Sequence, residues 1–239
     1  MPFRFDRSRL GAATLLAHAD PVVASYDTFS NFSGATFGGS GMPTDPAAVS
    51  TAKGITVALI ATQRYFNDAP THNGAGTYCV KAGVNDGLGT VAHSIASKWN
   101  FGYYINLGTA PASNYNIDVF YDLDPTAGTA MAQLGRIDVD AILAAQGAGG
   151  TSLIQDSQSL SFAFLNNGIP GYVTAPGIAF DPNAAGEYAF VVRVSNKNGD
   201  VLVQTSILVD VGGVPEPASL ALVGVALLAL VGSTRRRKA

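Results

Sequence analysis

The chain has 239 residues, of which 47% are aliphatic or aromatic, 13% are charged and 27 are glycines. This balance excludes a disordered polar tail and is typical of one β-rich domain with many turns. The formal net charge is −3, but the charges are segregated, because residues 20–217 hold seven lysines and arginines against sixteen aspartates and glutamates. Phosphate backbones would repel so acidic a body, which argues against nucleic-acid binding.

The N-terminal segment has the parts of a secretory signal peptide. Three arginines between residues 4 and 9 form a basic region, and an apolar stretch of eight residues ends at Ala17. The tripeptide Ala-His-Ala that ends at Ala19 has the small-x-small form of a signal-peptidase site, and Val-Val-Ala ending at Ala24 is a second candidate. We therefore predict a signal peptide over residues 1–24, with cleavage after 19 or 24, and an extracytoplasmic domain over residues 25–211.

Six segments of this domain alternate between apolar and polar residues, or are continuously apolar, and are bounded by turn residues, as strands are. They are Ile55–Phe66, Thr77–Ala82, Trp99–Leu107, Ile117–Asp122, Gly186–Ser195 and Val201–Val211. The last two flank an Asn-Gly pair and predict a β-hairpin. Residues 129–147 leave two alternatives open, a strand from Arg136 to Ile142 or a short helix that ends at Gly147. The predicted fold is all-β, a single antiparallel β-sandwich of Ig-like or jelly-roll-like type.

Two features of these strands bear on function. Cys79 is the only cysteine, which excludes an intramolecular disulfide and a cysteine-rich metal site. Its T-Y-C-V-K setting predicts a buried small hydrophobe, with a reactive or intermolecular thiol as the alternative.

Farther on, strand alternation places Trp99, Phe101 and Tyr103 on one face and Tyr104 on the other. We predict that the first three belong to the core, and the alternative is an exposed aromatic row that binds sugars.

The two histidines of the body lack the spacing of metal ligands, since no local pair such as H-x-x-x-H is present. We predict that His72 is a solvated residue in a polar loop and that His93 lies in a structured segment without ligand function. The sequence therefore predicts no catalytic residue, no cofactor-binding residue and no metal site.

Two glycine-rich stretches match catalytic or nucleotide-binding patterns only loosely. Gly38–Met42 fails the nucleophile-elbow pattern G-x-S-x-G at its last position. Gly87–Ala92 fits G-x-G-x-x-A, but aromatic strands follow it and no acid lies between residues 91 and 112, so we predict a glycine-rich loop. A Ser-His-Asp triad assembled from distant residues leaves a secreted hydrolase as a remote alternative.

The acidic residues give two further candidates. Asp118, Asp122 and Asp124 lie close together, but the loop lacks the D-x-[DN]-x-[DN]-G calcium pattern, so we predict turn-forming aspartates rather than calcium ligands. Asp181, before Pro-Asn, is predicted to form a turn in the same way. Glu187 is the only glutamate of the body, and we predict a solvated residue at the start of a strand rather than a glycosidase acid.

The C-terminal segment, residues 212–239, has three parts. Pro215, Glu216 and Pro217 keep the chain extended, and the uncharged residues 218–233 follow. As a helix this stretch would be about 24 Å long at 1.5 Å per residue, and flanking residues would extend it across the membrane. The basic tail holds Arg235, Arg236, Arg237 and Lys238. These residues predict a single transmembrane helix with a cytoplasmic tail and the preceding domain outside.

This array resembles the PEP-CTERM sorting signal of Gram-negative bacteria, in which Pro-Glu-Pro, a short apolar helix and a basic cluster end the chain. The resemblance implies processing by an exosortase, transient membrane anchoring, and release or transfer to the cell envelope or outer surface. Because proteins with this signal accompany exopolysaccharide production, it also implies a non-enzymatic role in a biofilm or extracellular matrix, with exopolysaccharide as a partner. A carbohydrate-binding module is the alternative function.

The body also resembles a group of proteins often found with this signal. Five phrases carry this second resemblance, at Ala61–Tyr65, Lys98–Phe101, Tyr121–Pro125, Gln155–Leu160 and Phe180–Tyr188. The group has no activity that transfers to this chain, so the resemblance supports the class of protein and adds no chemistry.

Overall fold

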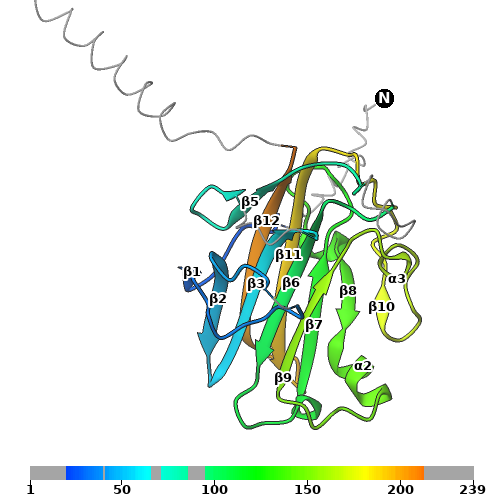
Figure 1. The fold of residues 1–239 in the computed structure, drawn as a ribbon. Coiled ribbons are helices and arrows are strands. Elements are labelled where there is room, and N and C mark those ends of the chain that lie inside the picture. Colours follow the sequence, from blue (N-terminus) through cyan, green and yellow to red (C-terminus); the bar gives the residue numbers. More distant parts are fainter. Residues whose placement is uncertain (1–19, 40, 66–70, 86–94, 213–239) are drawn as a thin grey trace, which may run out of the picture.

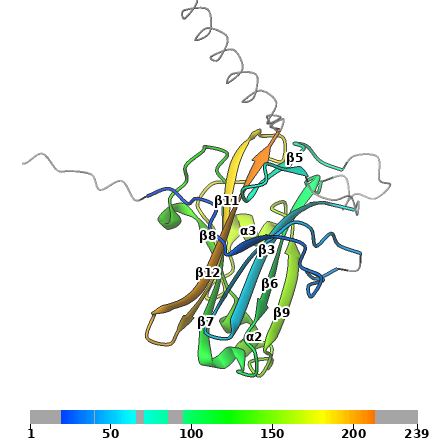
Figure 2. The same cartoon turned by 90° about the vertical axis from the view of Figure 1, so that its left-hand side faces the viewer.

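The structure is a computed structural model, and it describes residues 20–212 except residues 40, 66–70 and 86–94. Strands make up 44% and helices 10% of it, in two sheets, which confirms the all-β prediction. The sheets lie as two layers with the core between them, an arrangement consistent with the predicted sandwich (Figures 1 and 2).

Five strands form the first sheet and seven form the second. In spatial order, the first holds β1 (Thr28–Ser30), β2 (Ala47–Ala52), β3 (Ile55–Gln63), β6 (Trp99–Asn106) and β9 (Leu153–Gln158). The second holds β10 (Val173–Thr174), β8 (Gly135–Asp138), β7 (Tyr115–Tyr121), β11 (Gly186–Asn196), β12 (Val201–Val211), β5 (Thr77–Val80) and β4 (Thr71–His72). The helical segments are α2 (Val139–Ala145), α3 (Ala163–Asn167) and two 3₁₀ turns at Ala112–Asn114 and Met131–Gln133. All six predicted strands are present.

The predicted hairpin is the pair β11 and β12. The two strands run antiparallel from the Gly186–Val211 pair to the Ser195–Val201 pair, with one irregularity between Val194 and Ser195. Gly199 has φ +92° in the turn, which a side chain would disfavour. The Asn196 side-chain oxygen accepts hydrogen bonds from the backbone N–H groups of residues 198 and 200, each at 2.9 Å. The local turn chemistry therefore fixes this pair, as the sequence predicted.

The prediction of a purely antiparallel sandwich was wrong at one place. β5 pairs with β12 in parallel, with Thr77 opposite Leu208 and Val80 opposite Val211. The two strands are far apart in sequence and no hairpin joins them, so no local turn imposes an antiparallel direction.

The ambiguous segment contains both a strand and a helix. β8 ends at Asp138, and α2 begins at the next residue and ends at Ala145. The Asp138 carboxylate accepts a hydrogen bond from the backbone N–H of Ala141 at 3.0 Å, which is the N-cap that starts the helix. Each of the two alternatives was thus correct for one half of the segment.

Aromatic rings fill the core at the end of the sandwich where β6 begins. Trp99, Phe101 and Phe190 are at most 1% exposed, and Phe101 stacks on Phe190 with ring centroids 4.6 Å apart. Trp99 also meets Phe190 edge-on at 5.9 Å and Tyr188 at 5.8 Å. These rings join the two sheets, because β6 belongs to the first and β11 to the second.

The helices of residues 20–212, as far as the structure describes that range, are all too short or too polar to cross a membrane. The predicted transmembrane helix at residues 218–233 lies outside the described residues.

Candidate functional site

The predicted sorting residues Pro215, Glu216 and Pro217 and the basic residues 235–238 lie outside the described residues. The described structure reaches Gly212, whose backbone N–H donates to the carbonyl of Val80 at 2.8 Å, directly after β12. The β-sheet structure therefore extends up to the residue before the C-terminal segment.

At the other end of the domain, residues 21–25 contact the seven-stranded sheet. The Val22 N–H donates to Thr129 at 3.0 Å, and Ser25 exchanges two backbone hydrogen bonds with Ser206, at 3.1 and 2.9 Å. Val22 packs on an apolar cluster that includes Phe120 and Val191, both of which are buried. This segment thus covers apolar surface that would otherwise face water.

The aromatic residues singled out in the sequence are core residues, as predicted. Trp99 is 1% exposed, Phe101 is 0% and Tyr103 is 5%. Tyr104, on the other face, is also buried, against Phe32 at 5.0 Å in an edge-on contact. This run therefore does not form an exposed aromatic row.

Cys79 departs from its prediction, because it is half-buried rather than buried. The strand alternation is correct, but it turns the neighbours Tyr78 and Val80 into the core and leaves the thiol on the other face. Burial and the nearby carboxylate of Asp210 raise the pKa of the Cys79 thiol, which disfavours the reactive thiolate.

His72 lies in β4 and is exposed. Its Nδ1 accepts a hydrogen bond from the Gly74 N–H at 3.0 Å, and its ring meets Phe29 edge-on at 5.4 Å. In the part of the chain that the structure describes, no three His, Cys, Asp or Glu residues cluster as metal ligands would. His93 and the loop Gly87–Ala92 lie outside the described residues, as does Ser40 of the failed nucleophile elbow.

Three of the candidate aspartates form turns, as predicted. Asp122, Asp124 and Asp181 each accept a hydrogen bond from the N–H two residues later, at 2.9 Å in all three cases. Asp122 is 1% exposed, and burial raises its pKa. Glu187 lies in β11, half-buried, and accepts a weak hydrogen bond from the Gly128 N–H at 3.4 Å.

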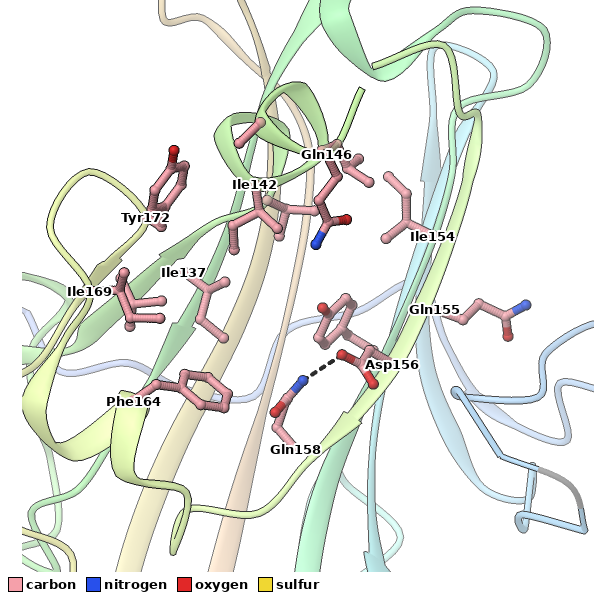
Figure 3. Close-up of a pocket in the computed structure, with 15 residues that line it drawn as sticks. Ile137, Ile142, Gln146, Ile154, Gln155, Asp156, Gln158, Phe164, Ile169 and Tyr172 are labelled. Carbon is pink, nitrogen blue, oxygen red and sulfur yellow. Dashed lines mark hydrogen bonds between the residues drawn. The ribbon is translucent and has the colours of Figure 1, made fainter. Parts of the chain in front are cut away.

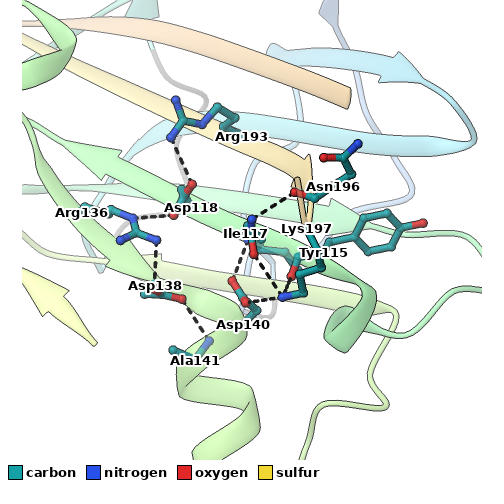
Figure 4. A network of polar contacts seen from close by, with 11 residues as sticks. Tyr115, Ile117, Asp118, Arg136, Asp138, Asp140, Ala141, Arg193, Asn196 and Lys197 are labelled. Atoms are coloured by element: carbon teal, nitrogen blue, oxygen red, sulfur yellow. Dashed lines mark hydrogen bonds and ion pairs between the residues drawn. The ribbon is translucent and has the colours of Figure 1, made fainter. Parts of the chain in front are cut away.

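Asp118 was wrongly grouped with the turn-forming aspartates. It lies inside β7 and is 4% exposed, and its two oxygens pair with Arg136 at 2.5 Å and Arg193 at 3.2 Å (Figure 4). Arg136 also pairs with Asp138 at 2.9 Å. The strands β8, β7 and β11 are neighbours, so their register brings the charges together in a structural ion-pair network.

A cavity of about 590 Å³ opens where the edges of the two sheets separate. One wall is β9 with Tyr103 of β6, and the opposite wall comes from β8, α2, α3 and the segment around β10 (Figure 3). The opposite wall is largely apolar, with Ile137, Ile142, Phe164 and Ile169. This volume is within the range of small-molecule sites.

The β9 wall is polar where a sandwich normally has apolar residues. Ile154, Asp156 and Gln158 share the face of β9 that lines the cavity, because side chains alternate along a strand, whereas Gln155 points away (Figure 3). The Asp156 carboxylate accepts from its neighbour Ser157 N–H at 2.8 Å and from the Gln158 side-chain amide. Burial raises the pKa of Asp156, and these hydrogen bonds only partly offset the effect.

Two further polar side chains, those of Gln158 and Tyr103, lie near the Asp156 carboxylate. The amide of Gln158 donates to Asp156, so its Oε1 acceptor points elsewhere and has no partner, although the residue is only 9% exposed. Tyr103 lies directly opposite Asp156 on the neighbouring strand. Burial and the Asp156 charge raise the pKa of the Tyr103 hydroxyl, which therefore stays protonated at neutral pH. The three groups form the polar end of an apolar cavity.

No sequence pattern indicated this cavity. Leu153–Gln158 was not predicted as a strand, because Gln, Asp and Ser have low strand propensity and no apolar alternation marks the segment. The sequence feature that could have indicated a polar cavity wall is Q-D-S-Q, a run of four consecutive polar residues.

A comparison with protein families matches residues 213–237 to the PEP-CTERM protein-sorting motif. The match includes the Pro-Glu-Pro and three of the four basic residues, and Lys238 is one residue beyond it. The comparison with curated proteins found no significant match. The matched motif implies export and a destination in the cell envelope or at the cell surface. The chain carries, at residues 213–237, the C-terminal signal of an exosortase substrate.

Proposed function

We propose that this protein is a non-enzymatic component of the cell surface or extracellular matrix, which an exosortase processes and which acts beside exopolysaccharide. The observation that carries the proposal is the sorting motif at residues 213–237, directly after the last strand of the domain. In the proposed route a helix at residues 218–233 anchors the chain in the membrane before cleavage. The finer fold assignment, Ig-like or jelly-roll-like, stays a prediction.

The position of the motif supports processing without damage to the domain. β12 ends at Val211, and Gly212 makes the last described backbone hydrogen bond, to Val80. A cut near Pro215–Pro217 would therefore remove no strand residue and none of the core residues. The domain would keep the contacts that stabilise it after its anchor has been removed.

The N-terminal contacts favour one of the two predicted signal-peptidase sites. Cleavage after residue 24 would remove Val22 from the seven-stranded sheet and expose Phe120 and Val191 beneath it. It would also remove the Val23 carbonyl, which accepts from the Ser206 hydroxyl at 2.6 Å. We therefore propose cleavage after Ala19, so that the mature chain begins at Asp20. Mass spectrometry of the N-terminal peptide of the exported protein tests this, and a chain that begins at Ser25 would contradict it.

The sorting proposal is tested by expression in an exosortase-positive host and in the matching deletion strain. We expect the C-terminal peptides with Arg235–Lys238 to be absent from the mature protein in the first strain and retained in the second. Replacement of Glu216 by Ala should give the deletion phenotype in the positive host. Glu187→Ala, a change of the same type outside the motif, is the matched control and should leave processing intact.

Identical C-terminal peptides in both strains would contradict exosortase processing. The matrix role has a separate measurement, the amount of protein that sediments with exopolysaccharide from wild-type cells and from cells that make none. Equal recovery in both would exclude the association while leaving the sorting result unaffected.

The two other functions gain little support. The carbohydrate-binding alternative relied on an exposed aromatic row, and the run Trp99–Tyr104 is buried. For the hydrolase alternative, His72 is exposed, and its Nδ1 and ring contact Gly74 and Phe29 rather than a serine or an aspartate.

A further inference from the structure

The cavity beside β9 has the form of a binding site for a small amphiphilic molecule. Its volume is about 590 Å³, and its far wall is aliphatic and aromatic. Ile169 and Tyr172 line it as well and are 41% and 36% exposed, so apolar surface continues from the interior to the mouth. Binding of an apolar body here would remove this surface from water.

The polar end of the cavity requires a donor rather than an acceptor. The Asp156 carboxylate is an acceptor, and the Gln158 Oε1 is a buried acceptor without a partner. A buried polar atom of this kind costs free energy unless a partner is supplied. Tyr103, which pairs with Asp156 in the strand register, also lines the cavity, and its hydroxyl can accept a hydrogen bond.

The charge of the cavity determines which donor fits best. Among the described residues that line it, Asp156 is the only acid, and none is basic. A carboxylate or phosphate ligand would meet uncompensated repulsion from Asp156. A single hydroxyl donates one hydrogen bond, whereas a protonated primary amine donates three and compensates the charge of the half-buried carboxylate.

We propose that this cavity binds a small amphiphilic cation, with an aliphatic or aromatic body against Ile137, Ile142 and Phe164 and a protonated primary amine against Asp156, Gln158 Oε1 and the Tyr103 hydroxyl. The proposal depends on the geometry of the cavity alone, so it is independent of exosortase processing.

Three ligands of matched shape test the proposal on the full chain in nanodiscs, with empty nanodiscs as the reference for lipid partition. They are 2-phenylethylammonium, 2-phenylethanol and 3-phenylpropanoate, and calorimetric titration gives each affinity. The ammonium ion is expected to bind about tenfold or more tightly than the alcohol, because a charge-assisted hydrogen bond is stronger than a neutral one. The carboxylate is expected to bind most weakly.

Three variants assign the preference to the site. Asp156→Asn keeps the shape of the side chain and should reduce the affinity for the ammonium ion to that for the alcohol. Asp210→Asn on β12 removes the same charge outside the cavity lining and should change neither affinity. Ile142→Trp fills the apolar part and should abolish binding of both ligands.

The proposal is overturned if wild-type protein binds the ammonium ion no more tightly than the alcohol, or binds neither. It is also overturned if Asp156→Asn, folded by circular dichroism, retains the preference. Because the ligand series is measured first on the wild-type chain, a variant that fails to fold does not prevent the decision.

Discussion

The surroundings of Asp118 and Asp156 differ in how each carboxylate is compensated. Asp118 lies on β7 in the seven-stranded sheet and meets two guanidinium groups, Arg136 and Arg193. Asp156 lies on the cavity-lining face of β9 and meets a backbone N–H and a neutral amide, with no cation among the described residues that line the cavity. The first region is a completed ion-pair network, and the second keeps a charge that its own neighbours do not neutralise.

The two regions serve different purposes. A carboxylate that is paired with arginines joins three strands and stabilises the sheet. A carboxylate that is half-buried without a cation has a raised pKa and costs stability, unless something outside the chain pairs with it. Such a cost at a cavity is typical of a binding site rather than of a structural one.

The largest expected effect is at the paired carboxylate. Asp118→Asn should destabilise the protein by about 2 kcal/mol, because it leaves two arginines without their acceptor. This figure lies below that for a fully buried pair, since the Arg136 and Arg193 side chains are 41% and 28% exposed. Urea denaturation measures the loss, and Asp200→Asn in the exposed hairpin turn is the control for the charge change. A loss below about 0.5 kcal/mol would show that the network contributes little.

The next largest effect is an expected gain in folding stability. The double substitution Asp156→Leu and Gln158→Leu should stabilise the domain by about 1 kcal/mol, because well-placed apolar side chains often replace buried polar pairs with a gain. It extends the apolar face that Ile154 begins on the same strand. The same denaturation measurement applies, and a destabilised variant would mean that the two polar residues hold β9 in place.

The sequence predicted the parts of the fold that local chemistry determines. The β11–β12 hairpin follows from its Asn-Gly turn, and the inward face of β6 follows from the alternation of Trp99, Phe101 and Tyr103. The parallel pairing of β5 with β12 depends on a contact between residues about 130 positions apart, which no local pattern encodes.

The site was less predictable than the fold for the same reason. Asp156 has no sequence signature of its own, and only the folded β9 places it beside Gln158 and opposite Tyr103. The roles of the aspartates on β7 and its following turn were separable only in three dimensions. Asp122 bonds its own turn, whereas Asp118 reaches arginines on two neighbouring strands. The sorting signal, in contrast, is a linear motif and was readable in full from the sequence.

The smallest expected effect is a difference between the wild type and Asp156→Asn in how folding stability depends on pH. The folded state raises the pKa of Asp156, so the folded protein binds this proton more tightly than the unfolded chain does. This contribution to stability is therefore present below the ordinary aspartate pKa, near 4, and is lost as the pH rises through the higher folded value. Asp156→Asn lacks the titration. Its stability relative to the wild type should rise between about pH 4 and pH 7.

Urea midpoints of both proteins across that range measure the difference. Burial also raises the pKa values of Asp122 and Asp138, but these groups are present in both proteins and cancel in the comparison. If 2-phenylethylammonium occupies the cavity, it should reduce the difference at neutral pH, because the bound cation stabilises the ionised carboxylate of the wild type and has no such partner in the amide variant. A stability difference between the two proteins that stays constant with pH would mean that the Asp156 carboxylate is as well solvated in the folded protein as in the unfolded chain. Asp118 and Asp156 would then differ only in the two arginines that pair with Asp118.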